Sequence, residues 1–407
     1  MTPALEFKHV DILFAQDREA QKKLPAAQQA LREGASRAVI TQRFGVVAGV
    51  VDANLRVASG EIAVLMGLSG SGKSTLLRAA NGLNRVSSGK VLLQDGAGSV
   101  DVASCTPQEL RRVRRQCIAM VFQQFGLLPW RSVRDNVGFG LELRGDDPAK
   151  RRKAVDQKLE LVGLTQWADR SVGELSGGMQ QRVGLARAFA TEADILLMDE
   201  PFSALDPLIR SRLQDELLAL QARVRKTILF VTHDLDEALR IGNQISILEG
   251  GRIVQTGLPR DIVMRPANDY VAAFVRHMNP LTMLTGELVM RPLSQCLHEG
   301  GYYWLDPERR LRVEIDAAGG LVGARAEGNA LTLQGPQRTD TAIPAQAIAV
   351  VSMETSLQAI ISLANATQRP VLITDNGRFR GSCGAAEIVA ALDRNRAGGT
   401  GAGATPG

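Results

Sequence analysis

The fold is decided by one stretch, residues 67–74, which reads Gly67-Leu68-Ser69-Gly70-Ser71-Gly72-Lys73-Ser74 and fits the phosphate-loop pattern GxxxxGK[ST]. A buried strand over Ile62–Met66 is expected to enter this loop, and a helical pattern from Ser74 to Asn81 leaves it. Glycines let backbone N–H groups converge on phosphate oxygens, and the N-terminus of the helix favours negative charge. A glycine-rich turn that fitted the pattern by chance would rarely lie between a strand and a helix. The stretch therefore predicts a nucleotide phosphate site, with Lys73 at the β- and γ-phosphates and the Ser74 hydroxyl on magnesium.

Further short apolar runs follow the loop at intervals along the chain. They are Ile118–Phe122, Ile195–Met198, Ile228–Thr232 and Gln244–Glu249, and helical or turn patterns separate them. Strands that alternate with helices predict an α/β fold with a mostly parallel sheet covered on both faces. Residues from about 133 to 190 are nearly all helical in pattern, which predicts an inserted helical subdomain.

Two carboxylates follow the apolar strand Ile195–Met198, at Asp199 and Glu200. Ligands of such sheets bind at the carboxyl ends of the strands, so both acids are expected beside the phosphate loop. Asp199 would hold magnesium, directly or through water, and Glu200 would act as general base toward the attacking water. Acids at a strand end are common on protein surfaces, and the phosphate loop gives this pair its significance.

The segment Leu175–Arg182, which reads LSGGMQQR, resembles the signature motif of ATP-binding cassette (ABC) ATPases. Other motifs of that family match in order, from about residue 44 to residue 278. Gln123 resembles the Q-loop residue, Ser203–Asp206 the D-loop and His233 the switch histidine. Phe44 lies where the family places an aromatic ring under the adenine, if the strand after it is ungapped.

The resemblance implies a P-loop NTPase core with an antiparallel edge sheet, ATP and Mg²⁺ as cofactors, and a set of site residues. It assigns catalysis to Glu200, His233 and Gln123, magnesium to Ser74, Gln123 and Asp199, and a D-loop role to Asp206. It assigns ATP contacts to Phe44, Gly67, Leu68, Ser69, Gly70, Ser71, Gly72, Lys73, Ser74 and Thr75.

The signature motif is expected to act across a dimer. Ser176, Gly177 and Gly178 open a helix, which offers a second anion-binding N-terminus. One phosphate loop already surrounds its side of the nucleotide, so the second cradle has to come from the opposite face. In the family the partner protomer supplies it, with Gln180 in the same motif, and the resemblance therefore implies a homodimer.

Three local stretches resemble the quaternary-amine uptake group of ABC importers: Met66–Thr75, Phe125–Arg131 and Met278–Leu281. The segments Asp95–Cys105 and Gln166–Arg170 resemble the choline branch most. The resemblance implies an ATP-hydrolysing subunit that drives uptake of choline or a related quaternary amine, and a glycine betaine or proline importer with osmotic regulation is the alternative. It also implies integral membrane permease partners, an external solute-binding protein reached indirectly, and a peripheral place on the cytoplasmic face of the membrane.

The chain is expected to divide into four parts: an N-terminal extension (1–43), the ATPase domain (44–278), a small α+β domain (279–393) and a disordered tail (394–407). Val350–Leu392 resembles one cystathionine-β-synthase (CBS) type repeat. Residues 281 to about 345 match a first repeat poorly, so a packing or dimerisation module is as good an interpretation as an ionic-strength sensor.

Composition sets limits on the remaining function classes. The formal charge is only +5 and 22% of residues are charged, while no apolar run approaches the roughly 20 residues of a membrane span. Four scattered cysteines predict no metal or disulfide pattern. The basic run Arg111–Arg115 has no interleaved aromatic residues and is interpreted as a solvated helix face, not a nucleic-acid surface. A soluble non-transport cassette ATPase is the alternative of a different class; such proteins usually carry two cassettes or a long coiled-coil insertion.

Overall fold

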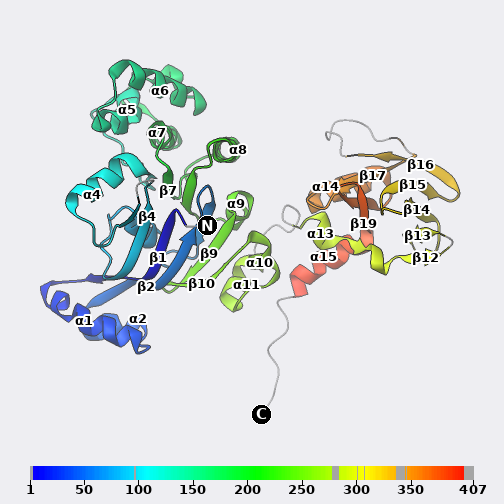
Figure 1. Ribbon diagram of the computed structural model, residues 1–407, viewed down its shortest axis with the longest axis horizontal. Helices are drawn as coiled ribbons and strands as arrows, with labels where there is room; N and C mark the ends of the chain where they lie inside the picture. Colours follow the sequence, from blue (N-terminus) through cyan, green and yellow to red (C-terminus); the bar gives the residue numbers. More distant parts are fainter. Residues whose placement is uncertain are drawn as a thin grey trace, which may run out of the picture. The chain divides into compact units, whose positions relative to one another are not determined.

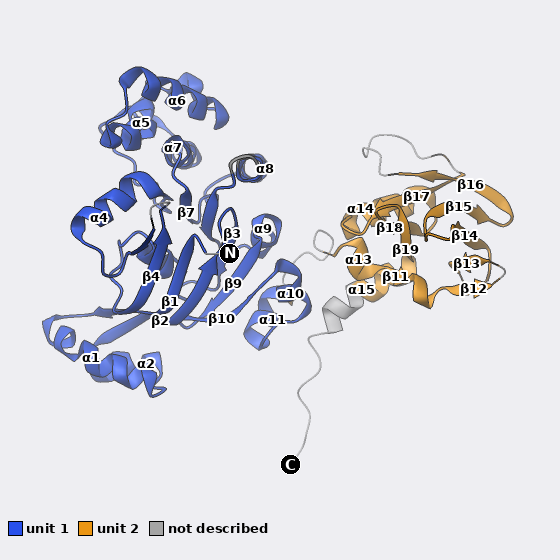
Figure 2. Cartoon of the chain, in the orientation of Figure 1, with its two compact units in different colours: residues 1–275 blue, residues 276–407 orange. Residues whose placement is uncertain are grey.

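The computed structural model describes residues 3–95, 98–276, 284–299, 301–306, 308–335, 344 and 346–397. It contains two compact units, residues 1–275 and 276–407 (Figure 2). The division falls close to the domain boundary that the sequence predicts at residue 278. The stretch Met278–Leu281, which resembles the uptake group, lies outside the described residues.

The first unit is built around a six-stranded sheet in the order β10-β9-β3-β8-β7-β6. Neighbouring strands from β9 to β6 pair in parallel, and only β10 is antiparallel. Every side chain of β3, β7 and β8 is buried, as expected for strands covered on both faces. The strands are β3 (Ile62–Met66), β6 (Ile118–Val121), β7 (Ile195–Asp199), β8 (Thr227–Val231), β9 (Gln244–Glu249) and β10 (Arg252–Gly257). The α/β prediction is confirmed.

A second, antiparallel sheet packs on the first in the order β2-β1-β4-β5. Its strands are β1 (Leu5–Ala15), β2 (Val46–Val57), β4 (Ser88–Gln94) and β5 (Ser99–Asp101). Helix α3 (Lys73–Ala79) leaves the phosphate loop. Its side chains Leu76 and Leu77 are buried in one apolar cluster with residues of both sheets. The loop is thus anchored in the core at both of its ends. The predicted antiparallel edge sheet is confirmed.

Two helices, α1 (Arg18–Arg32) and α2 (Arg37–Phe44), interrupt the hairpin between β1 and β2. They pack through Ala20, Ala27 and Leu31 on the face of the hairpin that carries Leu13, Val46 and Ala48. The segment 1–43, expected as an extension, therefore contains an inner strand of the second sheet, and the boundary expected at residue 43 lies inside α2.

Among the remaining helices of the first unit, those of the helical subdomain group together beyond one end of the strands (Figure 1). The helical subdomain consists of α5 (Val133–Arg144), α6 (Pro148–Leu161) and α7 (Gly177–Ala190), with 3-10 turns at Thr165–Trp167 and Val172–Glu174. Ser132, Asp147 and Ser176 cap its three helices. The others are α4 (Pro107–Arg112), a π-helical turn (Val113–Cys117), α8 (Pro207–Val224), α9 (Leu235–Ile241), α10 (Pro259–Met264) and α11 (Asp269–Arg276). In the part of the chain that the structure describes, no helix has both the length and the apolar character of a membrane span.

The second unit forms one nine-stranded sheet in the order β11-β19-β18-β17-β16-β15-β14-β13-β12. The expected CBS-like repeat corresponds to β17-α14-β18-β19-α15, and the poorly matching segment before it forms an antiparallel run that continues the same sheet through a parallel β16–β17 pair. The α+β prediction for this unit is confirmed, and helix α15 continues to Ala397, beyond the expected start of the tail. Its elements are α13 (Gly286–Val289), β11 (Arg291–Pro292), a 3-10 turn (Leu293–Gln295), β12 (Leu297–Glu299), β13 (Tyr302–Trp304), β14 (Leu311–Ile315), β15 (Leu321–Ala326), β16 (Asn329–Gln334), β17 (Ala347–Ser352), α14 (Leu357–Thr367), β18 (Val371–Asp375), β19 (Arg378–Cys383) and α15 (Ala385–Ala397). The tail from residue 398 lies outside the described residues.

Candidate active site

The phosphate loop leaves the carboxyl end of β3 and is shaped by its glycines. Gly67 and Gly72 have φ values of +148° and +101°. A Cβ atom at Gly67 would lie 2.3 Å from the Leu248 carbonyl oxygen, and one at Gly72 would lie 2.5 Å from that of Gly49. Both positions therefore require glycine for a steric reason as well as for their backbone conformation.

Lys73 is 6% exposed, and its ammonium group lies inside the loop. Its Nζ donates to the carbonyl oxygens of Gly67 at 2.8 Å and Leu68 at 2.9 Å. Burial lowers the pKa of Lys73, and the nearby carboxylates of Glu200 and Asp199 act in the opposite direction. The cation is thus held by the loop where phosphate oxygens are expected.

Asp199 ends β7 with no solvent exposure. Its Oδ1 accepts from Ser74 Oγ at 2.6 Å, and its Oδ2 accepts from Arg78 Nη2 at 2.9 Å and Nε at 3.2 Å. The hydroxyl and the carboxylate that the sequence assigns to magnesium are therefore adjacent, and hard oxygen donors of this kind fit Mg²⁺. Arg78, which sequence analysis did not single out, compensates the buried charge of Asp199.

Two residues that the sequence assigns to catalysis contact one oxygen of the Glu200 carboxylate. Gln123 Nε2 donates to Glu200 Oε2 at 3.2 Å, and His233 Nδ1 lies 3.5 Å from the same oxygen. Glu200 has a left-handed backbone (φ +48°) and its N–H donates to the Val231 carbonyl oxygen at 3.0 Å. The turn that follows β7 thus directs Glu200 toward the loops that end β6 and β8. The three predicted catalytic residues come together.

Gln181 is a site residue that sequence analysis missed. It is buried on α7, where its Nε2 donates to the Glu200 carbonyl oxygen at 3.3 Å and its Oε1 accepts from Ala204 N–H at 3.2 Å. It therefore joins the signature helix to the base and to the D-loop. Its position in the signature motif, directly after Gln180, was the available signal.

The signature residues form the N-terminus of α7. Ser176 is the N-cap, and its Oγ accepts from Met179 N–H at 3.4 Å, while Gly177 is exposed. Gln180 Nε2 donates to the carbonyl oxygens of Val172 and Leu175, at 3.0 and 3.1 Å. Its amide therefore stabilises the segment that precedes α7. Among the described residues, no hydrogen bond or ion pair joins Ser176–Gly178 to the phosphate loop of the same chain.

The D-loop ends in Asp206, which caps α8 by accepting from Ile209 N–H at 3.0 Å. Helix α8 is joined to α9, which follows His233, by a buried pair: Gln214 Nε2 donates to Glu237 Oε1 at 2.9 Å. Burial is the main cause that raises the pKa of Glu237, against the hydrogen bonds from Thr232 and Gln214. The D-loop helix and the switch helix therefore share a polar contact in the core.

The structure does not bring Phe44 to this site. Phe44 ends α2 and packs with Leu13, Val46 and Ala48, on one face of β2. Gly49 alternates with Ala48 along β2 and so lies on the opposite face of the strand. A Cβ atom at Gly49 would lie 2.8 Å from Phe14 Cε2 and 3.2 Å from Thr75 Cγ2. Of the two phenylalanines, Phe14, near the end of β1, is therefore the one on the side of β2 that faces Thr75, and it is 41% exposed.

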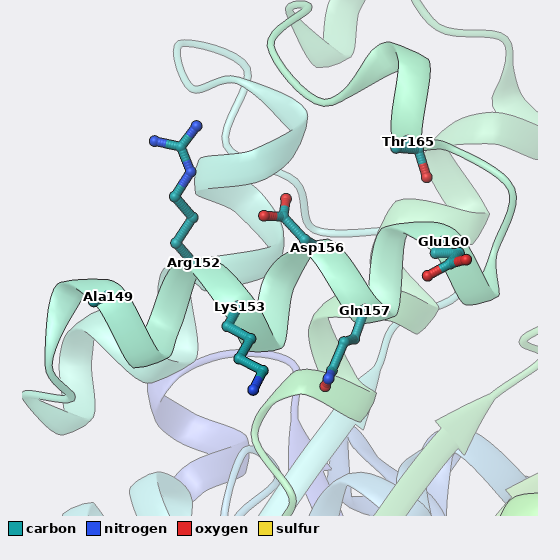
Figure 3. Close-up of a pocket in the computed structure, with 7 residues that line it drawn as sticks. All are labelled: Ala149, Arg152, Lys153, Asp156, Gln157, Glu160 and Thr165. Atoms are coloured by element: carbon teal, nitrogen blue, oxygen red, sulfur yellow. The ribbon is translucent and has the colours of Figure 1, made fainter.

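A separate hollow of about 760 Å³ lies along α6, near the 3-10 turn at Thr165. Its charged and polar side chains spread along the helix and do not converge on one point (Figure 3). They belong to Arg152, Lys153, Asp156, Gln157 and Glu160. None is a predicted site residue, and the hollow has the character of a solvated helix face.

Comparison with known proteins agrees with this geometry. A family profile described as ABC transporter matches residues 50–203. The chain is 41% identical to the glycine betaine/carnitine transport ATP-binding protein of Listeria monocytogenes, over 92% of this chain and 95% of that one. It is 40% identical to the glycine betaine/proline betaine transport ATP-binding protein of Escherichia coli, over 97% and 98%.

A solved structure gives the same result for the fold. A bacterial ABC transporter cassette, determined as a dimer, is 29% identical to this chain with a TM-score of 0.53, and the match covers 63% of this chain and 99% of the cassette. The phosphate loop, Asp199 and Glu200 and the signature helix α7 all lie inside residues 50–203, which match the family profile. The chain therefore belongs to the ABC transporter family, as an ATP-binding subunit.

Proposed function

We propose that the chain hydrolyses ATP to drive an importer of glycine betaine, choline or a related quaternary amine. The observation that carries the proposal is the convergence of Gln123 and His233 on Glu200 Oε2, next to the phosphate loop. The substrate class is supported by the relatives, whose names specify glycine betaine, carnitine and proline betaine. The choline branch and the glycine betaine alternative both belong to this class, and the non-transport alternative receives no support from relatives that match nearly the whole chain.

The mechanism assigns each side chain one task. Lys73 neutralises the β- and γ-phosphates, and Ser74 and Asp199 would hold Mg²⁺, with Gln123 as a further ligand that the resemblance implies. Mg²⁺, when bound, supplies positive charge toward the developing charge on the phosphates. Glu200 accepts the proton of the attacking water. His233 and Gln123 both hold the Glu200 carboxylate in position through the same oxygen, Oε2. Phe14, in place of Phe44, stacks on the base of the nucleotide.

The dimer is part of the proposal, because the signature residues need a second chain. The exposed N-terminus of α7 offers free N–H groups to an anion. Leu208, at the first turn of the D-loop helix, is 79% exposed, and Leu68 in the phosphate loop is 60% exposed. These apolar side chains are suited to burial against a partner protomer. A symmetric pair would supply each phosphate loop with the Ser176–Gly178 turn of the other chain.

The permease partner is proposed to bind a groove of about 330 Å³ between the edge strand β6 and the helical subdomain. Its lining combines apolar and cationic side chains, including Leu83, Phe122, Phe139, Arg114 and Arg187. Leu83 is 48% exposed at its margin. Such a groove fits a short amphipathic helix of a membrane subunit, which would hold the chain at the cytoplasmic face of the membrane. An external solute-binding protein would then act through the permease.

The two units of the chain are proposed to divide the work. Residues 44–278 with β1 carry the ATPase, and residues 279–393 form a regulatory or dimerisation module. The continuous sheet of the second unit, with one CBS-like repeat, supports a packing role as well as it supports sensing.

The test is the Glu200→Gln variant, which keeps the shape of the side chain and removes the base. Its hydrolysis rate should fall by roughly 10²–10⁴-fold while ATP still binds. Gln124→Glu, a change at an exposed neighbour of Gln123, is the matched control and should hydrolyse ATP at close to the wild-type rate. Uptake of labelled choline and of labelled glycine betaine, by vesicles that contain the permease, identifies the substrate. Near-normal hydrolysis by Glu200→Gln would remove Glu200 from its role.

A further inference from the structure

The chain makes an unusual turn two residues after Gln123. Phe125 and Gly126 both have left-handed backbones, with φ values of +57° and +55°. A non-glycine residue seldom adopts this conformation unless its surroundings fix it. Inside the turn, Phe125 N–H donates to the Phe122 carbonyl oxygen at 3.0 Å and Gly126 N–H to that of Gln124 at 2.6 Å. These bonds leave the carbonyl oxygens of Phe125 and Gly126 free to accept from elsewhere.

Arg187, three turns along α7 from the signature residues, occupies both of those oxygens. Its Nη1 donates to the Gly126 carbonyl oxygen at 2.7 Å and its Nη2 to that of Phe125 at 2.7 Å. The planar guanidinium matches two successive carbonyl groups only when the turn has this shape. A lysine at the same position would offer one point charge in place of the fork.

Burial, and not a neighbouring charged side chain, dominates the electrostatic environment of the Arg187 guanidinium. Burial lowers its pKa, and no carboxylate of the described residues contributes to that shift. A guanidinium so placed needs its hydrogen bonds, because burying a charge without partners is strongly unfavourable. The bonds to the turn are therefore as necessary to Arg187 as they are to the turn.

This turn begins two residues after Gln123, whose Nε2 donates to Glu200 Oε2 at 3.2 Å. We propose that Arg187 is a positioning residue: it fixes the Phe125–Gly126 turn so that Gln123 stays within reach of Glu200, and it does so from the helix that begins with the signature residues. The inference deepens the proposed function and relies on it for the role of Gln123. Arg187 also lines the groove proposed for the permease, so an occupant of that groove would meet the same guanidinium.

A double-mutant cycle tests the path through Gln123. Arg187→Lys should lower kcat by roughly tenfold, within the range of couplings inside one hydrogen-bond network, and change KM for ATP less than about twofold. In a Gln123→Ala background the same change should lower kcat less than about twofold. Equal losses in both backgrounds, or no loss in the first, would overturn the proposal.

Arg144→Lys is the matched control in the same subdomain. Arg144 Nη1 also donates to a carbonyl oxygen beside α7, that of Thr191, at 2.7 Å. It has no contact with the Q-loop among the described interactions. Its kcat loss should stay below about twofold and be the same with and without Gln123.

Hydrogen exchange supplies a readout that is independent of catalysis and of the proposed function. In the nucleotide-free chain, Arg187→Lys should raise the exchange rates of the Phe125 and Gly126 amides at least about tenfold, because their bonds inside the turn open more often. Exchange in the central strand β8 should stay unchanged, which also reports that the variant is folded. Unchanged exchange at Phe125 and Gly126 would overturn the proposal, even if kcat fell. If exchange rises while Gln123→Ala hydrolyses ATP normally, the role proposed for Gln123 fails and the structural part of the inference stands.

Discussion

Replacing Phe14 by alanine should weaken ATP binding, whereas replacing Phe44 should not. Phe14 lies over Gly49 beside Thr75 Cγ2, at the start of the helix that follows the phosphate loop. Because its ring is 41% exposed, a base can cover it without displacing the core. Phe44 packs on the other face of β2, with Leu13, Val46 and Ala48.

The magnitude follows from stacking. A base on an aromatic ring contributes about 1–3 kcal/mol, so Phe14→Ala should raise the Kd for ATP by roughly 5- to 150-fold. Stacking uses the face of the base and not its polar edge, so GTP binding should weaken by a similar factor. Phe44→Ala should instead lower the free energy of unfolding by about 1–2 kcal/mol, less than the roughly 3–5 kcal/mol of a fully buried phenylalanine, because its ring is only partly buried.

Both quantities can be measured on the same proteins. Isothermal titration with ATP and with GTP gives the Kd values, and urea unfolding of the nucleotide-free chain gives the stabilities. Phe14→Leu, which keeps an apolar side chain and removes the π face, separates stacking from general contact and should resemble Phe14→Ala. The assignment would be refuted if Phe44→Ala weakened ATP binding at unchanged stability while Phe14→Ala bound ATP like the wild type.

Lys73→Ala should raise the Kd for ATP and abolish transport, because it deletes the cation inside the loop; calorimetric binding at the wild-type level would contradict this placement. Cysteines at Ser71 and Ser176, in a Glu200→Gln background that retains ATP, should crosslink between chains only when nucleotide is present; a crosslink within one chain on gel electrophoresis would contradict the composite site. Burial raises the pKa of Glu237, so its ionisation costs stability once the pH rises above the ordinary value of 4.5. Glu237→Gln should therefore show a smaller fall in the free energy of unfolding as the pH rises from 4.5 through the raised pKa; urea titrations that give parallel curves would contradict a buried acid.

The local parts of the site could be predicted because each motif carries its own geometry. The phosphate loop, Asp199 and Glu200 lie next to buried strands whose apolar character is plain in the sequence. Parallel pairing then brings their carboxyl ends to one edge of the sheet, and His233 arrives there after β8. Beyond the motifs themselves, this part of the site depends only on the order of the parallel strands.

The rest depended on contacts between distant segments. The pairing of β1 with β2 across α1 and α2 decides which phenylalanine reaches the loop, and sequence spacing alone pointed to Phe44. Gln181 and Arg187 act through carbonyl oxygens, which every residue has, so no pattern of side chains marks their partners. The segment before β17 matches a first repeat poorly because it forms an antiparallel run of strands in place of one.

The interrupted hairpin of the first unit has a consequence for folding kinetics. Ala15 pairs with Val46, so residues 16–45 must loop out before the two strands can meet. Closing a 30-residue loop costs roughly 2 kcal/mol more than closing a four-residue turn, since the cost grows as (3/2)RT ln n. The caps at Asp17 and Ser36 let α1 and α2 form locally, but the strand pairing itself is non-local, and non-local pairing is slow. Gly49 and Phe14 come together only in that pairing, so the base-binding side of the site is expected to be acquired later in folding than the phosphate loop, whose strand and helix are contiguous.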